Sequence, residues 1–515
     1  MSNQCLKDLF KASCDKYDAK TAISFVRDGN VETEISYRDL ERDSNRLANT
    51  FLDRGIRTGD RIILFFPKSL FFVLSYLALQ KIGGIAVPIN PGFKEGELSY
   101  LLKDAQPSLV LAGKEQNRLM KKTNLDIAVE KIDTDIPYKD IKFFKSASDN
   151  PLNVDLSPTD IGLIIYTSGT TGNPKGAVLT NQNLAHDALN IINIWEISES
   201  DVLCHSLPLF HVHGLCYALN AALIAGSKII MLDVFSSEKV IDLLSKKEPN
   251  DLCTLFMGVP TMYAGLIEAV QDKGLDFEHV RLWTSGSAPL PPKNFNEIQK
   301  VFGKEPVERE GMSETGMNFS NPFKGKRKAG SIGVPLPGLE VRVVDPETYI
   351  DVSKGSEGEI WLRGPGISPG YWRKPEETAK AFSDGWFKTG DLGRVDEDGY
   401  YFLTDRLKHI IISGGENISP KEIENVINQI PGVKESSVVG LPDEKWGERV
   451  VAAVVKESES PIEPSDVKET CLKKLHKWKC PKEVVFIDQL PKNAMGKVMK
   501  EDVKKIEAFK NTYLG

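Results

Sequence analysis

The chain has 515 residues, of which 41% are hydrophobic and 27% are charged, a mixture typical of globular proteins. Its net charge of -7 provides no broad basic surface and disfavours nucleic acids and anionic membranes as partners. The length exceeds what a single hydrophobic core usually supports, so two or more domains are expected.

The start of the chain lacks the basic region and the long apolar run of a secretory signal. The apolar stretch Leu70 to Leu79 is too short to span a bilayer and predicts a buried helix. Seven cysteines are scattered without a CxxC pair, which favours free thiols in a reducing compartment over a zinc site. We therefore expect a cytoplasmic protein without a transmembrane segment.

Strand and helix patterns alternate along the first two-thirds of the chain, which predicts an α/β architecture with largely parallel sheets. The expected strands are 62–66, 84–89, 108–112, 161–166 and 228–232, and the expected helices are 69–81, 181–195 and 238–247.

Short strand patterns separated by glycine and proline turns follow from Gly338, at 339–344, 358–363 and 399–403. Beyond them a helix is expected from Pro420 to Ile430, with Ser419 as its N-cap and proline at its first position. The remaining elements are strands at 433–440 and 450–455 and a helix at 464–475. We expect a large N-terminal α/β domain, residues 1–405, and a small α+β C-terminal domain, residues 406–515.

The strongest chemical signal is the stretch YTSGTTGNPKG, from Tyr166 to Gly176. Glycines allow a backbone to approach an anion closely, turn amides form a concave anion site, and hydroxyls and a lysine add donors. No Gly-Lys-Ser/Thr follows the glycines, so this is not a Walker A loop. The alternative is an ordinary polar turn. The candidate phosphate-binding residues are Thr167, Ser168, Gly169, Thr170, Thr171, Gly172 and Lys175.

This loop resembles the signature of the adenylate-forming superfamily, which includes acyl-CoA synthetases, luciferases and adenylation domains. Further stretches resemble the family's motifs in the same order along the chain. They are Arg309–Thr315, Trp386–Asp391, Asp405–Lys408 with Gly414–Ile418, and Pro491–Lys497. The resemblance implies a large N-terminal domain and a small mobile C-terminal domain. It also implies activation of a carboxylic acid with ATP and Mg²⁺ as an acyl-AMP, followed by transfer to coenzyme A.

The resemblance also assigns roles. Lys497 supports the charge that develops during adenylation, and Glu314, with Thr170, binds magnesium. Asp391 accepts from the ribose and Arg406 adds a second contact, while Lys408 marks the hinge between domains. Taken singly, each of these residues also fits a plain surface or capping role. The other cofactor contacts are expected at Ser287, Met312, Ser313, Gly414, Gly415 and Glu416.

The acid is less well defined. His211 resembles the family's aromatic gate beside the reacting carboxylate, although a packed core histidine fits the position equally well, and Gly286 lies in an expected pocket wall. His213 and Arg309 stand where malonyl-CoA synthetases hold a distal carboxylate, although Arg309 also fits simple neutralisation of Glu308 or Glu310. Glu310 itself replaces an aromatic residue that usually stacks on adenine.

These observations favour a small dicarboxylate such as malonate. The alternatives are oxalate, a medium- or long-chain fatty acid and, less favoured, an aromatic acid. From other functional classes we weigh an adenylation module that loads a carrier protein, a luciferase-like oxygenase and a non-catalytic binding protein. The sequence leaves the oligomeric state open.

Overall fold

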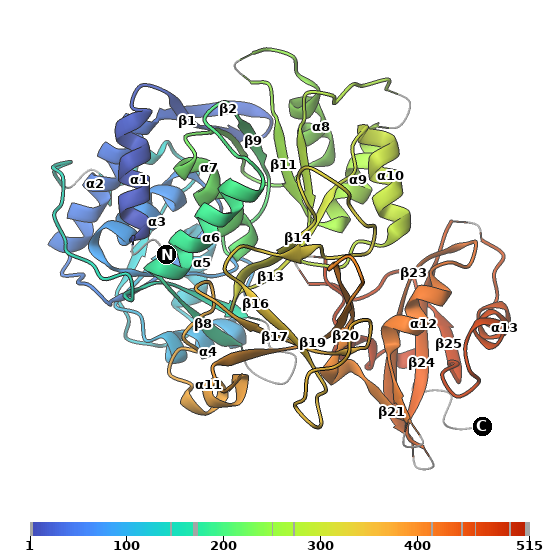
Figure 1. Cartoon of the computed structure of the whole chain (residues 1–515). Coiled ribbons are helices and arrows are strands. Elements are labelled where there is room, and N and C mark those ends of the chain that lie inside the picture. The colour runs from blue at the N-terminus through green and yellow to red at the C-terminus, as the bar shows by residue number, and fades with distance from the viewer. Residues whose placement is uncertain are drawn as a thin grey trace. The chain divides into compact units, whose positions relative to one another are not determined.

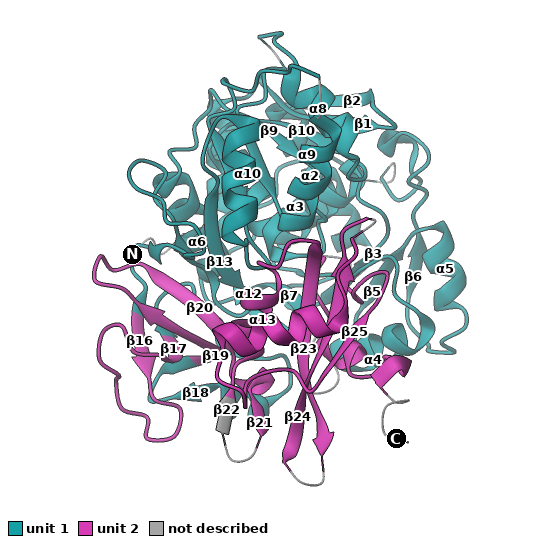
Figure 2. Cartoon of the chain, turned by 90° about the vertical axis from the view of Figure 1, so that its right-hand side faces the viewer, with its two compact units in different colours: residues 1–340, 362–387 teal, residues 341–361, 388–515 magenta. Residues whose placement is uncertain are grey.

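The computed structural model describes residues 4–144, 147–167, 174–249, 251–270, 273–413, 416–443, 446–458, 460–493 and 496–509. The chain forms two compact units (Figure 1, Figure 2). Unit 1 contains residues 1–340 and 362–387, and unit 2 contains residues 341–361 and 388–515. The domain boundary expected between residues 405 and 406 is a prediction about which part of the chain moves as a unit. Compactness does not test motion, so that boundary stays a prediction.

One sheet of unit 1 has six strands in the order β6-β5-β3-β4-β7-β8. All its neighbouring strands are parallel except β7 and β8, which form an antiparallel hairpin at one edge. Helices α4 (Glu95–Ala105) and α5 (Lys114–Met120) supply apolar side chains to the core on one of its faces. The strands are β3 (Arg61–Phe65), β4 (Ile85–Pro88), β5 (Leu109–Ala112), β6 (Val129–Lys131), β7 (Ile161–Thr167) and β8 (Lys175–Thr180).

The second sheet of unit 1 has nine strands in the order β15-β14-β13-β12-β11-β9-β10-β1-β2. Its six middle strands, β13 to β1 in this order, are parallel, and the strands outside them are antiparallel. The strands are β1 (Thr21–Arg27), β2 (Asn30–Ser36), β9 (Val202–His205), β10 (Lys228–Leu232), β11 (Leu255–Gly258), β12 (Leu282–Ser285), β13 (Val307–Met312), β14 (Gly316–Ser320) and β15 (Val334–Pro335).

Two groups of helices accompany this sheet. One packs into its apolar core and consists of α8 (Ser237–Ser245), α9 (Pro260–Val270) and α10 (Pro292–Phe302). The other connects the two sheets, because α6 contacts strands of both and its neighbours pack on one another and on one sheet or the other. It consists of α1 (Leu6–Lys16), α2 (Tyr37–Asp53), α3 (Leu70–Ile82), α6 (Asn181–Ile194) and α7 (Ala221–Ile224). The central helix α3 is buried almost throughout, as its apolar sequence predicts.

The C-terminal part of unit 2 is a sheet with an apolar core on each face. Its order is β22-β21-β24-β23, with β25 parallel to β24. Helices α12 (Pro420–Ile427) and α13 (Pro464–Lys474) fill one core, and α14 (Lys500–Val503) contributes Val503 to the other. The strands are β21 (Ile411–Ser413), β22 (Glu416–Ile418), β23 (Val433–Asp443), β24 (Gly447–Lys456) and β25 (Glu483–Phe486).

The chain passes from one unit to the other within a second set of strands. The crossings fall within β16 (Glu340–Val344), β17 (Gly358–Arg363) and β19 (Trp386–Val395). Within unit 2, β19 pairs with β20 (Tyr401–Arg406). The predicted α/β class is confirmed, and the elements expected from sequence form close to their predicted limits. Ser419 caps α12 as expected, since its side chain accepts from the Glu422 amide.

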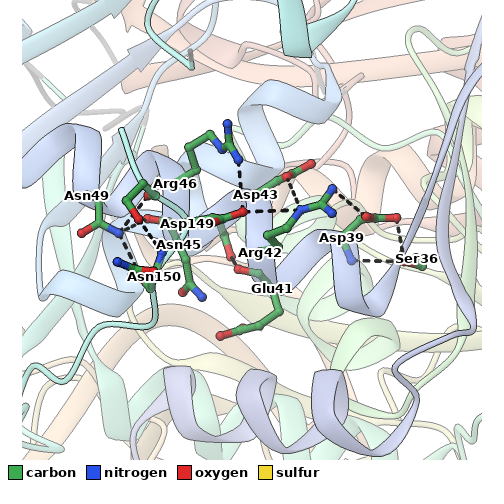
Figure 3. Close-up of polar contacts among 12 residues, drawn as sticks. Ser36, Asp39, Glu41, Arg42, Asp43, Asn45, Arg46, Asn49, Asp149 and Asn150 are labelled. Carbon is green, nitrogen blue, oxygen red and sulfur yellow. Dashed lines mark hydrogen bonds and ion pairs between the residues drawn. The ribbon is translucent and has the colours of Figure 1, made fainter. Parts of the chain in front are cut away.

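The polar side of α2 forms hydrogen bonds with Tyr138 and with residues 148–150 (Figure 3). Asn49 donates to the carbonyls of Ser148 and Asn150, at 3.1 and 3.0 Å. Asp43 is 2% exposed and accepts from the Tyr138 hydroxyl at 2.7 Å. A hydrogen bond between a buried carboxylate and a phenol hydroxyl is costly to break. Both groups have already lost their contact with water, so removing one leaves the other without a partner.

We expect Asp43→Ala to lower the free energy of unfolding by about 2 kcal/mol, because it leaves the buried Tyr138 hydroxyl without its acceptor. Urea unfolding followed by fluorescence measures the change. Asp149→Ala is the matched control in the segment that contacts this helix, where a half-exposed ion pair with Arg46 of α2 is worth less than about 1 kcal/mol. Equal losses in the two variants would contradict this account.

Candidate active site

The predicted phosphate loop connects the β7–β8 hairpin of unit 1. Thr167 and Lys175 face each other as the last paired residues, and the Thr167 hydroxyl donates to the Lys175 carbonyl at 3.3 Å. The hairpin therefore brings both ends of the loop together. Ser168, Gly169, Thr170, Thr171 and Gly172 lie outside the described residues, and their roles stay predictions.

A single aromatic ring connects this hairpin to the predicted magnesium ligand. Lys175 Nζ lies 5.2 Å from the centre of the Tyr371 ring, and the Tyr371 hydroxyl donates to Glu314 Oε1 at 3.0 Å. Lys175 and Glu314, far apart in sequence, thus approach the same side chain. Tyr371 was missed at the sequence level, because its ordinary Gly-Tyr-Trp surroundings carry no signal of catalysis.

Glu314 is a buried carboxylate. The residue is 9% exposed, which excludes the interpretation as a solvated surface acid. Across the described ranges, no group of three or more His, Cys, Asp or Glu side chains could hold a metal. Glu314 is thus the one predicted protein ligand that the structure describes here, and Mg²⁺ held by a single carboxylate would take its other ligands from phosphate oxygens and water.

Hydrogen bonds with Tyr217 and Asp187 fix the turn that carries Met312 and Ser313. The Met312 carbonyl accepts from the Tyr217 hydroxyl at 3.3 Å. Asp187 of α6 accepts from the Met317 amide at 2.8 Å, and burial raises the pKa of its carboxyl to about 7. These contacts set the path of the chain between β13 and β14.

Glu310 stands at the position expected for an adenine contact. Its Oε2 accepts from the side-chain amide of Asn318 at 3.0 Å. A carboxylate held in this way cannot stack on a base. The departure noted in the sequence therefore remains in the structure.

His213, Ser287, Gly286 and Arg309 form a cluster. His213 Nδ1 lies 3.1 Å from the Ser287 hydroxyl, and both His213 and Arg309 are almost fully buried. Gly286 allows the guanidinium to lie against the backbone, since a Cβ atom there would stand 2.6 Å from Arg309 Nε and Cζ. The Tyr217 ring lies 5.0 Å from the guanidinium and 6.2 Å from the imidazole.

Arg309 is influenced by nearby acidic groups, since the charges of Glu310 and Asp187 oppose the burial-driven fall of its pKa. Side chains alternate along a strand, so Arg309 projects to the opposite face from Glu308 and Glu310. Arg309 has no ion pair within the part of the chain that the structure describes, and its Nε and Nη2 atoms are buried without a hydrogen-bond partner there. His213 Nε2 is in the same condition among the described residues.

The two groups also influence each other. Burial, followed by the charge of Arg309, lowers the pKa of His213 far below its usual value, so the imidazole is neutral. The cluster thus presents guanidinium N–H donors and an imidazole nitrogen, a combination that fits an anion.

A partly buried lysine, which no local sequence pattern marks, holds the loop before this cluster. Lys68 Nζ lies 2.9 Å from His205 Nδ1 and 3.0 Å from both the His205 and Leu207 carbonyls. Burial lowers the pKa of Lys68 to about 7. Further along, His211 packs against Phe210 at 4.6 Å between ring centres, and burial lowers the pKa of its imidazole to about 4. His213 then opens a π-helix, His213–Asn220.

Unit 2 holds the remaining predicted residues. Asp391 is buried and pairs with Arg406 across β19 and β20, with 2.6 Å between Asp391 Oδ1 and Arg406 Nε. A cavity of about 300 Å³ beside this pair is lined by Thr389, Gly390, Arg406, Leu407 and Lys408.

Lys497 lies in a turn between Asn493 and Val498. Its amide donates to the Asn493 side chain at 3.0 Å, and Gly496 has a positive φ of 73°. Gly414 and Gly415 lie outside the described residues, as does the side chain of Glu416.

Several of these cations act electrostatically on the buried Asp391 carboxylate. Burial raises the pKa of its carboxyl, while Arg406, then Lys497, Lys408 and His409 oppose the rise. The structure therefore brings Asp391, Arg406, Lys408 and Lys497 into one electrostatic neighbourhood within unit 2.

The chain matches two family models, "AMP-binding enzyme" over residues 10–372 and "AMP-binding enzyme C-terminal domain" over residues 422–497. A long-chain-fatty-acid–CoA ligase of Bacillus subtilis is 32% identical, with 97% of this chain and 94% of that protein covered. A mitochondrial malonate–CoA ligase of Bos taurus is 35% identical, with 91% and 86% covered. The crystal structure of ATP-bound MatB from Rhodopseudomonas palustris is 37% identical, with 99% and 100% covered and a TM-score of 0.91.

The chain therefore belongs to the AMP-binding enzyme family. Its activity is that of an acid–thiol ligase, an acyl-CoA ligase that uses ATP and coenzyme A. Among the described helices, none combines the length and apolar character needed to cross a bilayer.

We expect Arg406→Met to weaken ATP binding, and to weaken it more at about pH 6 than at about pH 8. Arg406 is the main influence that opposes the burial-driven rise of the Asp391 pKa. Without it the carboxyl gains a proton as the pH falls and loses its charge. Isothermal titration calorimetry measures the effect, and Arg342→Met, whose partner Asp351 is exposed, is the control. Identical pH profiles for Arg406→Met and the unmodified protein would contradict this role.

Proposed function

We propose that this acyl-CoA ligase activates a small dicarboxylic acid such as malonate. The observation that supports this substrate class is the buried Arg309–His213 cluster, whose Nε, Nη2 and Nε2 atoms lack partners among the described residues. A buried polar atom without a partner is costly, and a buried unpaired charge is more so. A ligand carboxylate would satisfy the guanidinium and the imidazole together.

The ordinary carboxylate of a fatty acid is a weaker explanation for this cluster, because an alkyl chain would leave all three atoms unsatisfied. The Bacillus relative, named for long-chain fatty acids, keeps that class as the second candidate. Oxalate is the third, since it also carries a second carboxylate.

The first half-reaction joins the acid to the α-phosphate of ATP and releases pyrophosphate. We assign the β- and γ-phosphates to the loop between Thr167 and Lys175, and the magnesium ion to Glu314, with Thr170 adding a ligand. Bound magnesium would neutralise charge on the phosphates. His211 flanks the reacting carboxylate, and Lys497 stabilises charge as the phosphate–oxygen bond forms.

In the second half-reaction the thiol of coenzyme A displaces AMP from the acyl group. We assign Lys408 as the hinge that exchanges the Lys497 turn for the segment of Gly414, Gly415 and Glu416. Hinges concentrate backbone rotation in a few residues, and Lys408 is exposed in a short 3₁₀ turn, Leu407–His409, after β20. Asp391 and Arg406 are assigned to the ribose, Ser287, Met312 and Ser313 to further nucleotide contacts, and the cytoplasm is the proposed location.

Pyrophosphate release measured with malonate, oxalate, octanoate and palmitate tests the substrate class. We expect malonate to give the highest kcat/KM, and Arg309→Gln to lower that value by about 100-fold or more, because a buried charge pair is lost. Propionate, which lacks the distal carboxylate, should change much less in this variant. A preference for palmitate that survives Arg309→Gln would reject the dicarboxylate assignment.

Gly286→Ala supplies a gentler change to the same site. Its added Cβ would displace the Arg309 guanidinium, and a displacement of this size should lower kcat/KM for malonate about ten-fold or more. Gly96→Ala, on an exposed helical turn with open space around the new methyl group, is the matched control.

We expect Lys497→Ala to lower acyl-AMP formation by about 100-fold or more, while acyl-AMP supplied directly is still converted to the thioester. The reason is that the ammonium group serves only the adenylation step. The control is Lys492→Ala in the same loop, whose lysine pairs with Glu435. Normal pyrophosphate exchange by Lys497→Ala would remove the assignment.

A further inference from the structure

Tyr371 occupies a junction between three parts of unit 1. Its backbone forms an antiparallel bridge with Ala177 of β8, and the next amide, that of Trp372, donates to the Gly176 carbonyl at 2.8 Å. The Tyr371 amide donates to the Thr378 hydroxyl at 3.0 Å. The ring is therefore held by its own backbone against the strand that ends the phosphate loop.

The same short segment also holds the backbone of Glu314. The Ser368 amide donates to the Glu314 carbonyl at 2.8 Å, and the Ser368 hydroxyl donates to the Val178 carbonyl of β8 at 2.6 Å. Residues 368–372 thus fasten the main chain at Glu314 to β8. The Tyr371 hydroxyl adds a bond to the Glu314 side chain itself, at 3.0 Å.

The ring has a second polar neighbour. Lys175 Nζ lies 5.2 Å from its centre, within the range in which a cation is attracted to an aromatic face. One side chain therefore contacts both the cation at the end of the loop and the carboxylate assigned to the metal.

We infer that Tyr371 is a positioning residue that orients Glu314 toward the magnesium ion of Mg–ATP and Lys175 toward its phosphates. This inference rests on the proposed roles of Glu314 and of the loop. A carboxylate on a flexible side chain loses rotational freedom when it binds a metal, and a donor that already fixes one oxygen reduces that loss. The lysine chain gains in the same way from the ring beneath it.

The test separates magnesium-dependent from magnesium-independent nucleotide affinity. Isothermal titration calorimetry of the full chain measures ATP binding with excess Mg²⁺ and with a chelator. In Tyr371→Phe the ring stays and the donor is lost. We expect the enhancement of ATP affinity by Mg²⁺ to fall about ten-fold, the usual scale of one hydrogen bond to a charged group, while affinity without Mg²⁺ stays unchanged.

A second variant, Tyr371→Leu, also removes the ring. It should lower ATP affinity in the chelator as well, because Lys175 loses its aromatic support. Unchanged affinity there would overturn the part of the inference that concerns Lys175.

Glu314→Gln shows whether Tyr371 acts through the carboxylate. We expect Glu314→Gln alone to reduce the magnesium enhancement, and Tyr371→Phe added to it to cause no further reduction. A full additional loss in the double variant would overturn the inference. So would an unchanged magnesium enhancement in Tyr371→Phe when Glu314→Gln has lost it.

The control for a merely structural effect is Tyr138→Phe, which removes another phenol–carboxylate bond, that to Asp43. It should lower thermal stability without changing the magnesium enhancement. If the unmodified protein showed no magnesium-dependent ATP binding, the proposed metal site itself would fail. That result is distinct from a failure of Tyr371 alone.

Discussion

A charged group that is buried in this protein needs an ion-pair or hydrogen-bond partner, and the candidate active site is built around that constraint. Asp391 meets it internally, since Arg406 pairs with it at 2.6 Å. Lys68 meets it only in part, because two carbonyls and an imidazole surround its amino group and burial still lowers its pKa to about 7. Arg309 Nε and Nη2 have no hydrogen-bond partner in the described parts of the chain, which is the reason for the proposal that a ligand carboxylate binds there.

The folding of unit 1 explains why these groups meet. The parallel register of β12 and β13, in which Ser285 pairs with Glu308, brings Gly286 beside Arg309, and the π-helix that begins at His213 adds the imidazole. Ligand sites of α/β proteins commonly lie at such strand ends. The nine-stranded sheet thus carries the proposed acid site, and the edge hairpin of the six-stranded sheet carries the ends of the proposed phosphate loop.

The two sites in unit 1 share a design in which glycine and tyrosine decide the placement of charged groups. Gly286 leaves room for a guanidinium, which any larger residue would displace. Tyr217 and Tyr371 each place a ring beside a cation, Arg309 and Lys175 respectively. The Tyr217 hydroxyl donates to the Met312 carbonyl, and the Tyr371 hydroxyl donates to the Glu314 carboxylate. Each tyrosine therefore packs its ring against a cation while its hydroxyl forms a hydrogen bond.

The sequence by itself determined the α/β class, most elements, and the family through its ordered motifs, because periodicity and short glycine-rich signatures are local properties. It could not decide whether Arg309 pairs with its acidic neighbours or faces a ligand. Only strand alternation in the folded sheet places its side chain away from Glu308 and Glu310. Nor could it identify Lys68, Tyr217 or Tyr371, whose importance arises from contacts across more than fifty residues of chain. Such contacts are set by packing of the sheets and helices, which no local pattern records.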